Sequence, residues 1–440
     1  MIFCTNIYSF VFLWQKGRSG LRRIKIKFSY YLIKNFMKYK NKKLYIENLP
    51  IEKLAKKYGT PLYCYSLNKI KDNIANFKNN FKSINPTICF SVKSNSNIHL
   101  LKIIKKMGLG ADVVSKGELL KVLKVGMDPK KIVFSGVGKN YDELNLAIKK
   151  KILLINVESE SEIKQIEKIA NKIKTKVNIG IRLNPDIDPL TNSKISTGRK
   201  EDKFGISKKQ FVKIVKKINS SKNLNLQCLS VHIGSQITNY KPYSKMLNVI
   251  ENLIKKTKHN FNYVDLGGGM GIKYEKNSKE LNYQKYSSLI GSFLKKNKTK
   301  IIFEPGRSII GDTGILISKI IYIKDAIKIK FVIMDAAMND LIRPALYGAK
   351  HEIKAVKKNN IKINKLHEFV GPVCETSDKF SSLKKYQKLN ENDLLAIYDV
   401  GAYGMALSSN YNLRAKPAEI LVDRSKVKVI TKRQLIKNLI

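Results

Sequence analysis

One lysine of this chain lies where a reactive group is expected. Lys93 is part of the sequence FSVKSN, residues 90–95, at the end of a short apolar run where a strand should stop. A lysine in such a place can form a Schiff base with an aldehyde. Most of the 74 lysines of the chain are instead expected to be solvated. The surroundings of Lys93 therefore decide how it is interpreted.

Three further clusters of polar residues and glycines also follow apolar runs. They are HIGSQ at 232–236, DLGGGMG at 265–271 and EPGR at 304–307. Successive glycines let backbone N–H groups approach an anion that side chains would otherwise block. A glycine run alone is more often a turn, but its position together with Gly306 and Arg307 predicts a site for a phosphorylated ligand.

The elements that must position these clusters alternate between short apolar runs and charged stretches of helical periodicity. This pattern predicts parallel strands joined by helices. Eight such units over roughly 230 residues match a closed (β/α)₈ barrel, whose active site lies at the C-terminal ends of the strands. Lys93 and the three clusters all fall at that rim. The predicted strands span 88–93, 110–115, 131–136, 153–159, 177–184, 226–234, 263–269 and 301–306.

The chain changes character after about residue 311. Apolar runs bounded by turn residues occur at 330–334, 394–399 and 426–431. These runs predict a second domain built from β-sheet, following the barrel.

Taken together with further motifs, these clusters resemble the diaminopimelate decarboxylases. These are pyridoxal phosphate enzymes of the alanine racemase and ornithine decarboxylase fold group. The resemblance runs from about Tyr45 to about Ala418. The additional motifs are GADVVS at 110–115, ISTG at 195–198, KFG at 203–205, DAAMNDLIRPALY at 335–347, GPVCETSD at 371–378 and GAYG at 401–404.

The resemblance implies that one set of residues binds pyridoxal phosphate. Lys93 would form the Schiff base and His232 would stack on the pyridine ring, although a lone histidine at a strand end is more often structural. Glu304 would keep the ring nitrogen protonated, because a carboxylate partner raises the pKa of that nitrogen. The implied cofactor-binding residues are Lys93, Asp112, His232, Ser235, Gly267, Gly268, Gly269, Glu304, Pro305, Gly306, Arg307 and Tyr403.

A second set would bind the substrate. Arginine is scarce, with 10 residues against 74 lysines, yet Arg307 and Arg343 occur in motifs where the family binds a substrate carboxylate. Only a guanidinium offers a flat bidentate fork for that group, and ordinary ion pairing is the alternative. The implied substrate-binding residues are Arg307, Arg343, Tyr347, Glu375 and Tyr403, and the implied catalytic residues are Lys93, His232 and Cys374, the last as a candidate for reprotonation.

The implied reaction is decarboxylation of meso-2,6-diaminopimelate to L-lysine and carbon dioxide, the last step of lysine biosynthesis. Two alternatives stay open. One is a related decarboxylase or racemase of another basic amino acid, and a racemase would need a second acid–base residue on the opposite face of the ring and would not require Glu375. The other is a non-catalytic pyridoxal phosphate carrier, which would resemble a lone barrel and would not keep Arg343, Cys374, Glu375 and Tyr403.

The resemblance also implies how the chain is organised and assembled. Residues 37–64, including a strand near 43–46, would join the β domain of 313–440, and residues 65–312 would form the barrel. In a homodimer with shared active sites, the Cys374 loop would complete the site of the second subunit. Residues 1–36 show no resemblance. Their apolar run at 7–14 precedes the basic stretch, which is the wrong order for a secretory signal, and Met37 is an alternative start.

Composition limits the remaining possibilities. The net charge of +50 would favour nucleic acid, but the lysines are dispersed along predicted helix surfaces, so specific nucleic acid binding is not expected. No apolar stretch reaches the length of about 20 residues that crosses a membrane. The five cysteines lack a metal-binding repeat and are odd in number, which favours a reducing compartment, the cytoplasm. They are Cys4, Cys64, Cys89, Cys228 and Cys374.

Overall fold

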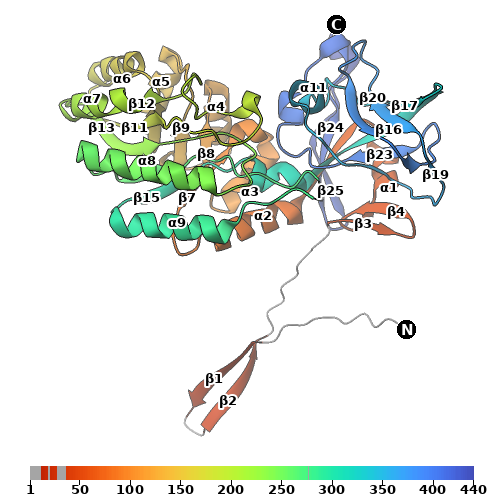
Figure 1. Cartoon of the computed structure of the whole chain (residues 1–440), viewed down its shortest axis with the longest axis horizontal. Coiled ribbons are helices and arrows are strands. Elements are labelled where there is room, and N and C mark those ends of the chain that lie inside the picture. Colours follow the sequence, from red (N-terminus) through yellow and green to blue (C-terminus); the bar gives the residue numbers. More distant parts are fainter. Residues whose placement is uncertain (1–10, 18–19, 27–35, 276) are drawn as a thin grey trace. The chain divides into compact units, whose positions relative to one another are not determined.

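The computed structural model describes residues 11–17, 20–26, 36–275 and 277–440 (Figure 1). The chain divides into two units at Phe36.

The described part of the first unit is an antiparallel hairpin of β1 (Val11–Gly17) and β2 (Gly20–Ile26). The apolar run at 7–14 therefore lies partly outside the described residues.

The second unit contains the closed (β/α)₈ barrel that the sequence predicts. Its strands are β7 (Thr87–Ser91), β8 (Gly110–Val113), β9 (Ile132–Phe134), β10 (Leu154–Val157), β11 (Val177–Asn184), β13 (Leu224–Ser230), β14 (Tyr263–Asp265) and β15 (Lys300–Phe303). They are parallel and pair in this order, and β15 pairs with β7, so the sheet closes. The eight predicted strands are confirmed, but seven of them end before their predicted last residue.

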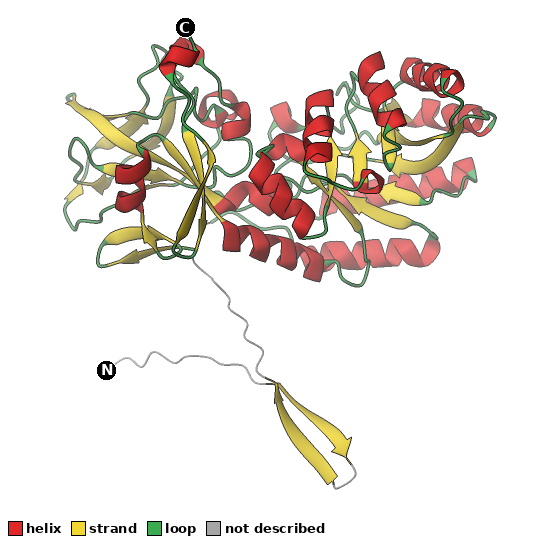
Figure 2. Ribbon diagram, turned by 180° about the vertical axis from the view of Figure 1, so that it is seen from behind, coloured by secondary structure: helices red, strands yellow, loops and turns green. Residues whose placement is uncertain are grey.

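Helices surround this sheet (Figure 2). Their bounds are α2 (Leu67–Asn80), α3 (Ile98–Lys106), α4 (Lys116–Lys124), α5 (Tyr141–Lys149), α6 (Glu160–Lys172), α7 (Lys208–Asn219), α8 (Lys241–Thr257), α9 (Tyr283–Lys296) and α10 (Arg307–Ile310). Helices α2 to α7 and α9 start after a Ser or Asn whose side chain accepts a backbone N–H of the first turn. In α8, Tyr243, Met246, Leu247 and Ile250 are buried and form one apolar stripe facing the sheet.

The barrel interior consists of two stacked layers of side chains, because residues two positions apart on a strand share a face. The lower layer is apolar and fully buried, and contains Cys89, Val133, Leu154, Cys228 and Ile302. Two residues further along each of these strands, towards the C-terminal end, the side chain is polar. These five are Ser91, Ser135, Asn156, Ser230 and Glu304, and Asp112 on β8 and Asp265 on β14 lie at the same level as Ser91 and Ser230; all seven are buried and form the polar layer.

The second domain is a nine-stranded sheet. Its strands are β6 (Leu62–Ser66), β16 (Gly314–Asp325), β17 (Ile329–Met334), β18 (Ile353–Ala355), β20 (Leu366–Val370), β21 (Lys379–Leu383), β23 (Leu394–Ile397), β24 (Ala418–Asp423) and β25 (Lys426–Thr431). The long strand β16 lies at the centre and pairs with β6, β17 and β23. The predicted runs at 330–334, 394–399 and 426–431 correspond to β17, β23 and β25.

The N-terminal segment of this unit lies against the β domain. The predicted strand at 43–46 is present as β4, and it pairs with β3 and β5 in a small separate sheet. The backbone N–H of Leu44 donates to the Val356 carbonyl oxygen at 2.8 Å, which attaches this small sheet to the domain. The strand that enters the nine-stranded sheet from this end of the chain is β6.

The remaining short elements connect these parts. They are β3 (Met37–Lys40), β4 (Lys43–Ile46), β5 (Leu49–Pro50), α1 (Ile51–Tyr58), β12 (Ile206–Ser207), α11 (Arg343–Tyr347), β19 (Lys362–Ile363) and β22 (Tyr386–Gln387). Within the described part of the chain, no helix combines the length and the apolar character needed to span a membrane.

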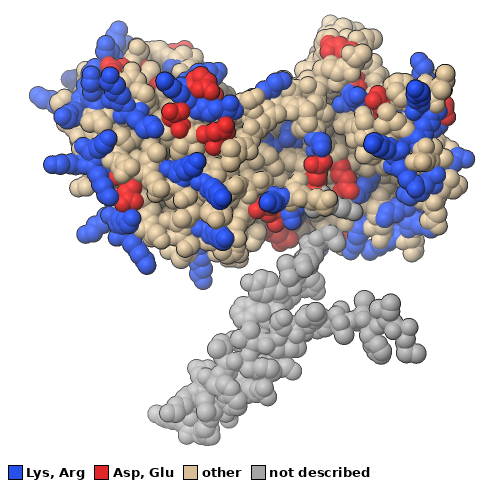
Figure 3. Space-filling model, viewed as in Figure 1, with Lys and Arg blue, Asp and Glu red and all other residues tan. Residues whose placement is uncertain are grey.

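Lysine and arginine side chains are dispersed over the face of the molecule shown in Figure 3. They cover both the barrel and the β domain and are interspersed with acidic side chains. On this face the basic side chains are dispersed rather than gathered in one track.

Candidate active site

Lys93 lies directly after β7, in a 3₁₀ turn formed by Val92–Ser94. Its Nζ is 2.9 Å from Oδ2 of the fully buried Asp112, while 36% of the Lys93 side chain remains exposed. Desolvation acts to lower the pKa of Lys93, but its acidic neighbours, Asp112 first, outweigh it, so the pKa is raised above its ordinary value. The amine can therefore be reached from the barrel mouth and is held as a cation by the buried carboxylate of Asp112.

Asp112 is held in position by Ser91, its neighbour in the polar layer. Ser91 Oγ donates to Asp112 Oδ2 at 2.7 Å. The other carboxylate oxygen, Oδ1, is buried and has no hydrogen-bond partner among the described residues. Asp112 thus holds the amine with one oxygen and keeps the other for a further donor.

A second carboxyl group of this layer, Glu304, follows β15. Burial raises its pKa well above the usual value, and the neighbouring Asp112 and Asp265 raise it further. Asp265 is itself held by Asn156 Nδ2 at 3.0 Å and by the backbone N–H of Gly267 at 2.9 Å. Because Asp265 receives these donors, we assign the proton of the Glu304–Asp265 pair to Glu304.

His232 lies after β13, above the polar layer. Burial lowers the pKa of His232 well below its ordinary value, and the cations Arg182 and Lys93 lower it further. The backbone N–H of Gly268 donates to His232 Nδ1 at 3.2 Å. His232 is therefore neutral and carries its proton on Nε2.

The glycine loop after β14 leaves no room for side chains. Gly267 has φ +63°, in the left-handed region, and a Cβ at this position would lie 2.6 Å from His232 Nδ1. A Cβ at Gly268 would lie 2.1 Å from the Glu304 carbonyl oxygen. The loop therefore lies directly against His232 and the Glu304 backbone, where only glycine fits, and the N–H groups of Gly267 and Gly268 donate to Asp265 and His232.

Arg307 begins α10, beside this loop, and is 6% exposed. It donates to the Tyr274 hydroxyl at 2.5 Å and to Ser235 Oγ at 3.1 Å. Its guanidinium also lies over the ring of Tyr403, 5.0 Å from the ring centre. Its Nε is buried without a partner among the described residues, so a donor remains for a ligand.

Arg343 begins α11 in the β domain and is 5% exposed. Its NH1 donates to His351 Nε2 at 2.8 Å, and its guanidinium lies 4.8 Å from the centre of the Tyr274 ring. Tyr274 therefore contacts both Arg307 and Arg343. Within the described residues, neither arginine forms an ion pair with a carboxylate.

Tyr403 and Tyr347 complete this side of the mouth. The backbone N–H of Tyr403 donates to the Ser94 carbonyl oxygen at 2.8 Å, which ties the β domain to the turn that carries Lys93. Tyr347 ends α11, close enough to Arg307 to influence its charge. Asn192 Nδ2 donates to the Tyr347 carbonyl oxygen at 3.0 Å.

Two predicted site residues, Cys374 and Glu375, are not brought into this cluster. Both are exposed on a loop of the β domain. Glu375 accepts hydrogen bonds from the Tyr411 hydroxyl at 2.5 Å and from Ser377 Oγ at 2.9 Å, and these bonds lower its pKa. Nothing in the described part of this one chain connects them to Lys93.

Pro305 and Gly306 lie between Glu304 and Arg307. The Pro305 carbonyl oxygen accepts from the backbone N–H of Ser91 at 3.1 Å, which joins the ends of β15 and β7. A Cβ at Gly306 would lie 2.9 Å from Ser94 Cβ, so this backbone also lies against the Lys93 turn.

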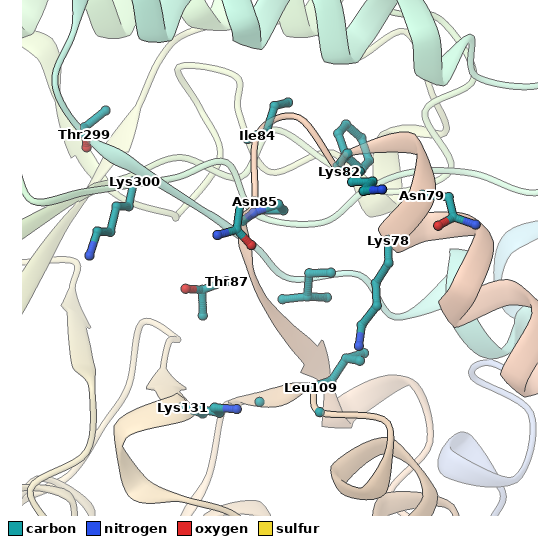
Figure 4. Close-up of a pocket in the computed structure, with 15 residues that line it drawn as sticks. Lys78, Asn79, Lys82, Ile84, Asn85, Thr87, Leu109, Lys131, Thr299 and Lys300 are labelled. Carbon is teal, nitrogen blue, oxygen red and sulfur yellow. The ribbon is translucent and has the colours of Figure 1, made fainter. Parts of the chain in front are cut away.

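A separate cavity of about 760 Å³ lies at the opposite end of the barrel. Figure 4 shows Lys78, Lys131 and Lys300 around it, near the N-terminal ends of the strands. It contains none of the predicted site residues. The end of a barrel that it occupies ordinarily serves stability rather than catalysis.

Two residues of the site were missed at the level of sequence, Tyr274 and His351. Tyr274 follows the glycine loop by a few residues, and His351 follows Arg343 by eight. No apolar run or spacing distinguishes them, because their roles depend on contacts with distant elements. The polar layer did carry a signal, since a polar residue stands two positions after a buried apolar one in Cys89/Ser91, Leu154/Asn156 and Cys228/Ser230.

Comparison with known proteins finds chains that are similar over most of their length. Residues 67–311 match the family described as "Pyridoxal-dependent decarboxylase, pyridoxal binding domain". Diaminopimelate decarboxylase from Aquifex aeolicus is 41% identical over 403 residues, which cover 91% of this chain and 95% of that protein.

Solved structures give the same grouping. The crystal structure of diaminopimelate decarboxylase from Helicobacter pylori complexed with L-lysine has a TM-score of 0.84 at 38% identity and covers 88% of this chain and 98% of its own. The enzyme from M. jannaschii in co-complex with L-lysine has a TM-score of 0.87 at 33% identity and covers 92% of this chain and 96% of its own.

Proposed function

Because the chain belongs to the diaminopimelate decarboxylase family of pyridoxal-dependent decarboxylases, we propose that it converts meso-2,6-diaminopimelate into L-lysine and carbon dioxide. The observation that carries this proposal is the pair of buried arginines that meet at Tyr274. Arg307 and Arg343 have no carboxylate partner among the described residues, and each keeps a buried Nε without a hydrogen bond. Two uncompensated guanidinium groups at the mouth fit a ligand set that brings a phosphate and a carboxylate.

The residues present fit pyridoxal phosphate. The glycine loop is a cradle that any Cβ would fill, and the Nε of Arg307 and Oδ1 of Asp112 are orphaned polar atoms. Lys93 would hold the cofactor covalently, and Gly267–Gly269, Gly306, Ser235 and Tyr403 would surround its phosphate. When bound, this cofactor supplies a conjugated pyridinium that delocalises the electron pair left behind as carbon dioxide departs.

Two side chains tune that ring. Glu304 would face the ring nitrogen, where its raised pKa suits sharing a proton with a base. His232 would lie against the ring, and because it is neutral it does not oppose positive charge on the pyridine.

The remaining residues orient the substrate. Arg307 and Arg343 would bind the carboxylate at the end that does not react, with Tyr347 beside them. This contact holds the reacting end in one orientation, and positioning of this sort can lower a barrier by several kcal/mol.

Glu375 and Cys374 act on the active site of a second subunit in this proposal. Glu375 would bind the remote amino group, and Cys374 would hold the proton that replaces carbon dioxide. Their exposure on one chain supports this arrangement, because a partner can then cover them. We also propose that the homodimer works in the cytoplasm, where the four cysteines of the described residues, all free, would remain reduced.

The proposal is tested with a panel of amino acids. The purified holoenzyme is incubated with meso-diaminopimelate, L-lysine, L-ornithine and L-arginine, and carbon dioxide and amine products are measured. We expect turnover of meso-diaminopimelate alone. Release of carbon dioxide from ornithine or lysine would support the decarboxylase alternative, and loss of optical purity without carbon dioxide would support a racemase.

Glu375→Ala tests the remote pocket in the same assay. We expect turnover of meso-diaminopimelate to fall by about 100-fold or more, since a site built for a charged group loses an ionic hydrogen bond. Cofactor absorbance should be unchanged. Glu391→Ala, at an exposed position before β23, is the control and should retain full activity. Unchanged kinetics in Glu375→Ala would remove Glu375 from the substrate site.

A further inference from the structure

Arg343 is the outer member of a hydrogen-bonded chain that leads away from the site. Its NH1 lies 2.8 Å from His351 Nε2, and His351 Nδ1 lies 2.7 Å from the Tyr398 carbonyl oxygen. His351 is 4% exposed and Arg343 is 5% exposed. The arginine is therefore attached, through one imidazole, to the backbone at the end of β23.

These partners allow only one state of the imidazole. A guanidinium can only donate, so Nε2 of His351 must accept and carries no proton. A carbonyl oxygen can only accept, so Nδ1 must carry the proton and donate. The geometry thus fixes His351 as the neutral Nδ1–H tautomer. Burial, together with Arg343, lowers the pKa of His351 to about 3, in agreement with that state.

The neutral imidazole of His351 affects Arg343 differently from a carboxylate partner. It orients the guanidinium without neutralising it, because an imidazole in this tautomer carries no net charge. The other neighbours of Arg343 are also without negative charge at neutral pH. They include the ring of Tyr274, at 4.8 Å, the side chain of Tyr403 and the guanidinium of Arg307. Arg343 is therefore held in place while no anionic group neutralises its positive charge. Its Nε has no hydrogen-bond partner among the described residues.

We propose that His351 is a positioning residue that aims Arg343 and keeps its charge available for the substrate carboxylate that is not lost in the reaction. This inference rests on the proposed function, in which Arg343 binds that carboxylate. His351 does not touch the substrate in this proposal and acts only through Arg343.

Two substitutions separate positioning from a structural role. In His351→Gln the amide is placed where Nε2 was, so its oxygen can still accept from Arg343. In His351→Asn the amide is placed where Nδ1 was, so it can still donate to the Tyr398 carbonyl oxygen but no longer reaches Arg343. If His351 served only to anchor its loop to β23, the Asn variant would be the mild one.

The readout is the affinity of the holoenzyme for two ligands that differ by one group. L-Lysine keeps the unreacted carboxylate, and 1,5-diaminopentane lacks it. In His351→Asn we expect the Kd for L-lysine to rise about 10- to 100-fold, the range for losing a hydrogen bond to a charged group. The Kd for 1,5-diaminopentane and the absorbance of the bound cofactor should stay unchanged. In His351→Gln both affinities should remain within about 3-fold of the original, since the acceptor is kept.

The control is His367→Asn. His367 is a buried histidine of β20 in the same domain, and its Nδ1 lies 2.7 Å from the Lys365 carbonyl oxygen. This variant should leave both affinities unchanged. The proposal is overturned if His351→Asn binds L-lysine normally, if it weakens both ligands equally, or if His351→Gln loses selectivity for L-lysine. Should the Asn variant fail to fold, the selectivity of the Gln variant alone decides.

A failure of the proposed function can be distinguished from a failure of the proposal for His351. If the unsubstituted enzyme does not release carbon dioxide from meso-diaminopimelate, the reaction assigned above is wrong. The ratio of the L-lysine and 1,5-diaminopentane affinities still reports whether His351 directs Arg343 towards a carboxylate.

Discussion

At the scale of single residues, the central contact is between Lys93 Nζ and Asp112 Oδ2 at 2.9 Å. The raised pKa of Lys93 means that the free amine is protonated at neutral pH. An amine must lose a proton before its nitrogen can attack an aldehyde. The Asp112 carboxylate therefore positions the lysine, and the lysine must give up a proton before its nitrogen can react.

Lys93→Ala should abolish both the absorbance of lysine-bound cofactor and turnover, because no other amine in this arrangement can replace it. The decrease in turnover should be at least about 1,000-fold, as for the loss of a group that forms a covalent intermediate. Spectra of the purified protein and carbon dioxide release measure the two effects. Lys124→Ala, on the exposed end of α4, is the matched control and should change neither. Full turnover in the Lys93 variant would rule out its assigned role.

The sequence predicts that a residue belongs to the active site only where its position relative to a predicted strand marks it. Lys93, His232 and Glu304 each follow an apolar run, so the end of the run marked them. Tyr274 and His351 do not, and they become recognisable only when Arg307 and Arg343 from separate elements meet around them. A sequence pattern describes neighbours on one element and carries little information on such contacts.

At the scale of elements, the glycine loop after β14 is the most restrictive part of the site. Gly268→Ala would place a Cβ 2.1 Å from the Glu304 carbonyl oxygen, so backbone must move. We expect a loss of about 1–3 kcal/mol in the free energy of unfolding and a weaker affinity for pyridoxal phosphate. Denaturant unfolding and cofactor titration measure these effects.

Gly291→Ala is the matched control for that substitution. Gly291 lies within α9, and a Cβ there has open space. This variant should be neutral or more stable by up to about 1 kcal/mol, because alanine favours a helix over glycine. If Gly268→Ala behaved like Gly291→Ala, the close approach of the loop to Glu304 would be wrong.

Element boundaries show where the sequence pattern stops being informative. The run at 88–93 was predicted as one strand, yet β7 ends at Ser91 and Val92 begins a turn. Val92 is fully buried, and Leu266, which follows β14, is only 1% exposed. Apolar residues thus continue past the last strand hydrogen bonds, because packing at the barrel mouth buries them, and hydrophobicity alone overestimates strand length.

Asp399 lies where the barrel and the β domain meet, and its surroundings disfavour the ionised carboxylate. Burial raises the pKa of Asp399 to about 8, and the acidic neighbours Asp312 and Glu352 contribute. In the folded protein this group holds its proton over a range where the unfolded chain has released it. The folded state therefore binds more protons, and stability falls as pH rises from about 4 to about 8.

Asp399→Asn should remove that decline. Asp399 has φ +59°, in a region that asparagine tolerates well, so the backbone should be kept. The melting temperature of the variant should exceed that of the original protein by an amount that grows between pH 4 and pH 8 and is constant above. A gain of a few degrees is expected, since about 1 kcal/mol moves Tm by roughly 1 °C in a chain of 440 residues, and each unit of the raised pKa corresponds to about 1.4 kcal/mol. A difference that did not change with pH would contradict the raised pKa.

At the scale of the whole molecule, the described chain holds only part of the proposed machinery. The barrel supplies Lys93 and Glu304, and the β domain adds Arg343 and Tyr403. Cys374, in contrast, is exposed on a loop. The barrel with its following β domain could be predicted from alternating patterns, but an interface between two copies leaves no comparable period in one sequence.

Mixing two inactive variants tests whether active sites are shared. When Lys93→Ala and Cys374→Ala chains are unfolded together and refolded, a mixed dimer would contain one site with both substitutions and one site with neither. Random pairing makes half of the dimers mixed, so activity should return to about one quarter of the original in a symmetric homodimer. Turnover of meso-diaminopimelate before and after mixing is the measurement.

The control for this experiment mixes Lys93→Ala with Glu304→Gln. Both residues belong to the same barrel, so every site of that mixed dimer keeps one defect and activity should not return. Recovery in the first mixture but not in the second requires that Cys374 acts across the interface, because only then does one site receive an intact barrel and an intact loop from different chains. Equal behaviour of the two mixtures would place Cys374 outside the partner's site, and the exposure of its loop would then need another explanation.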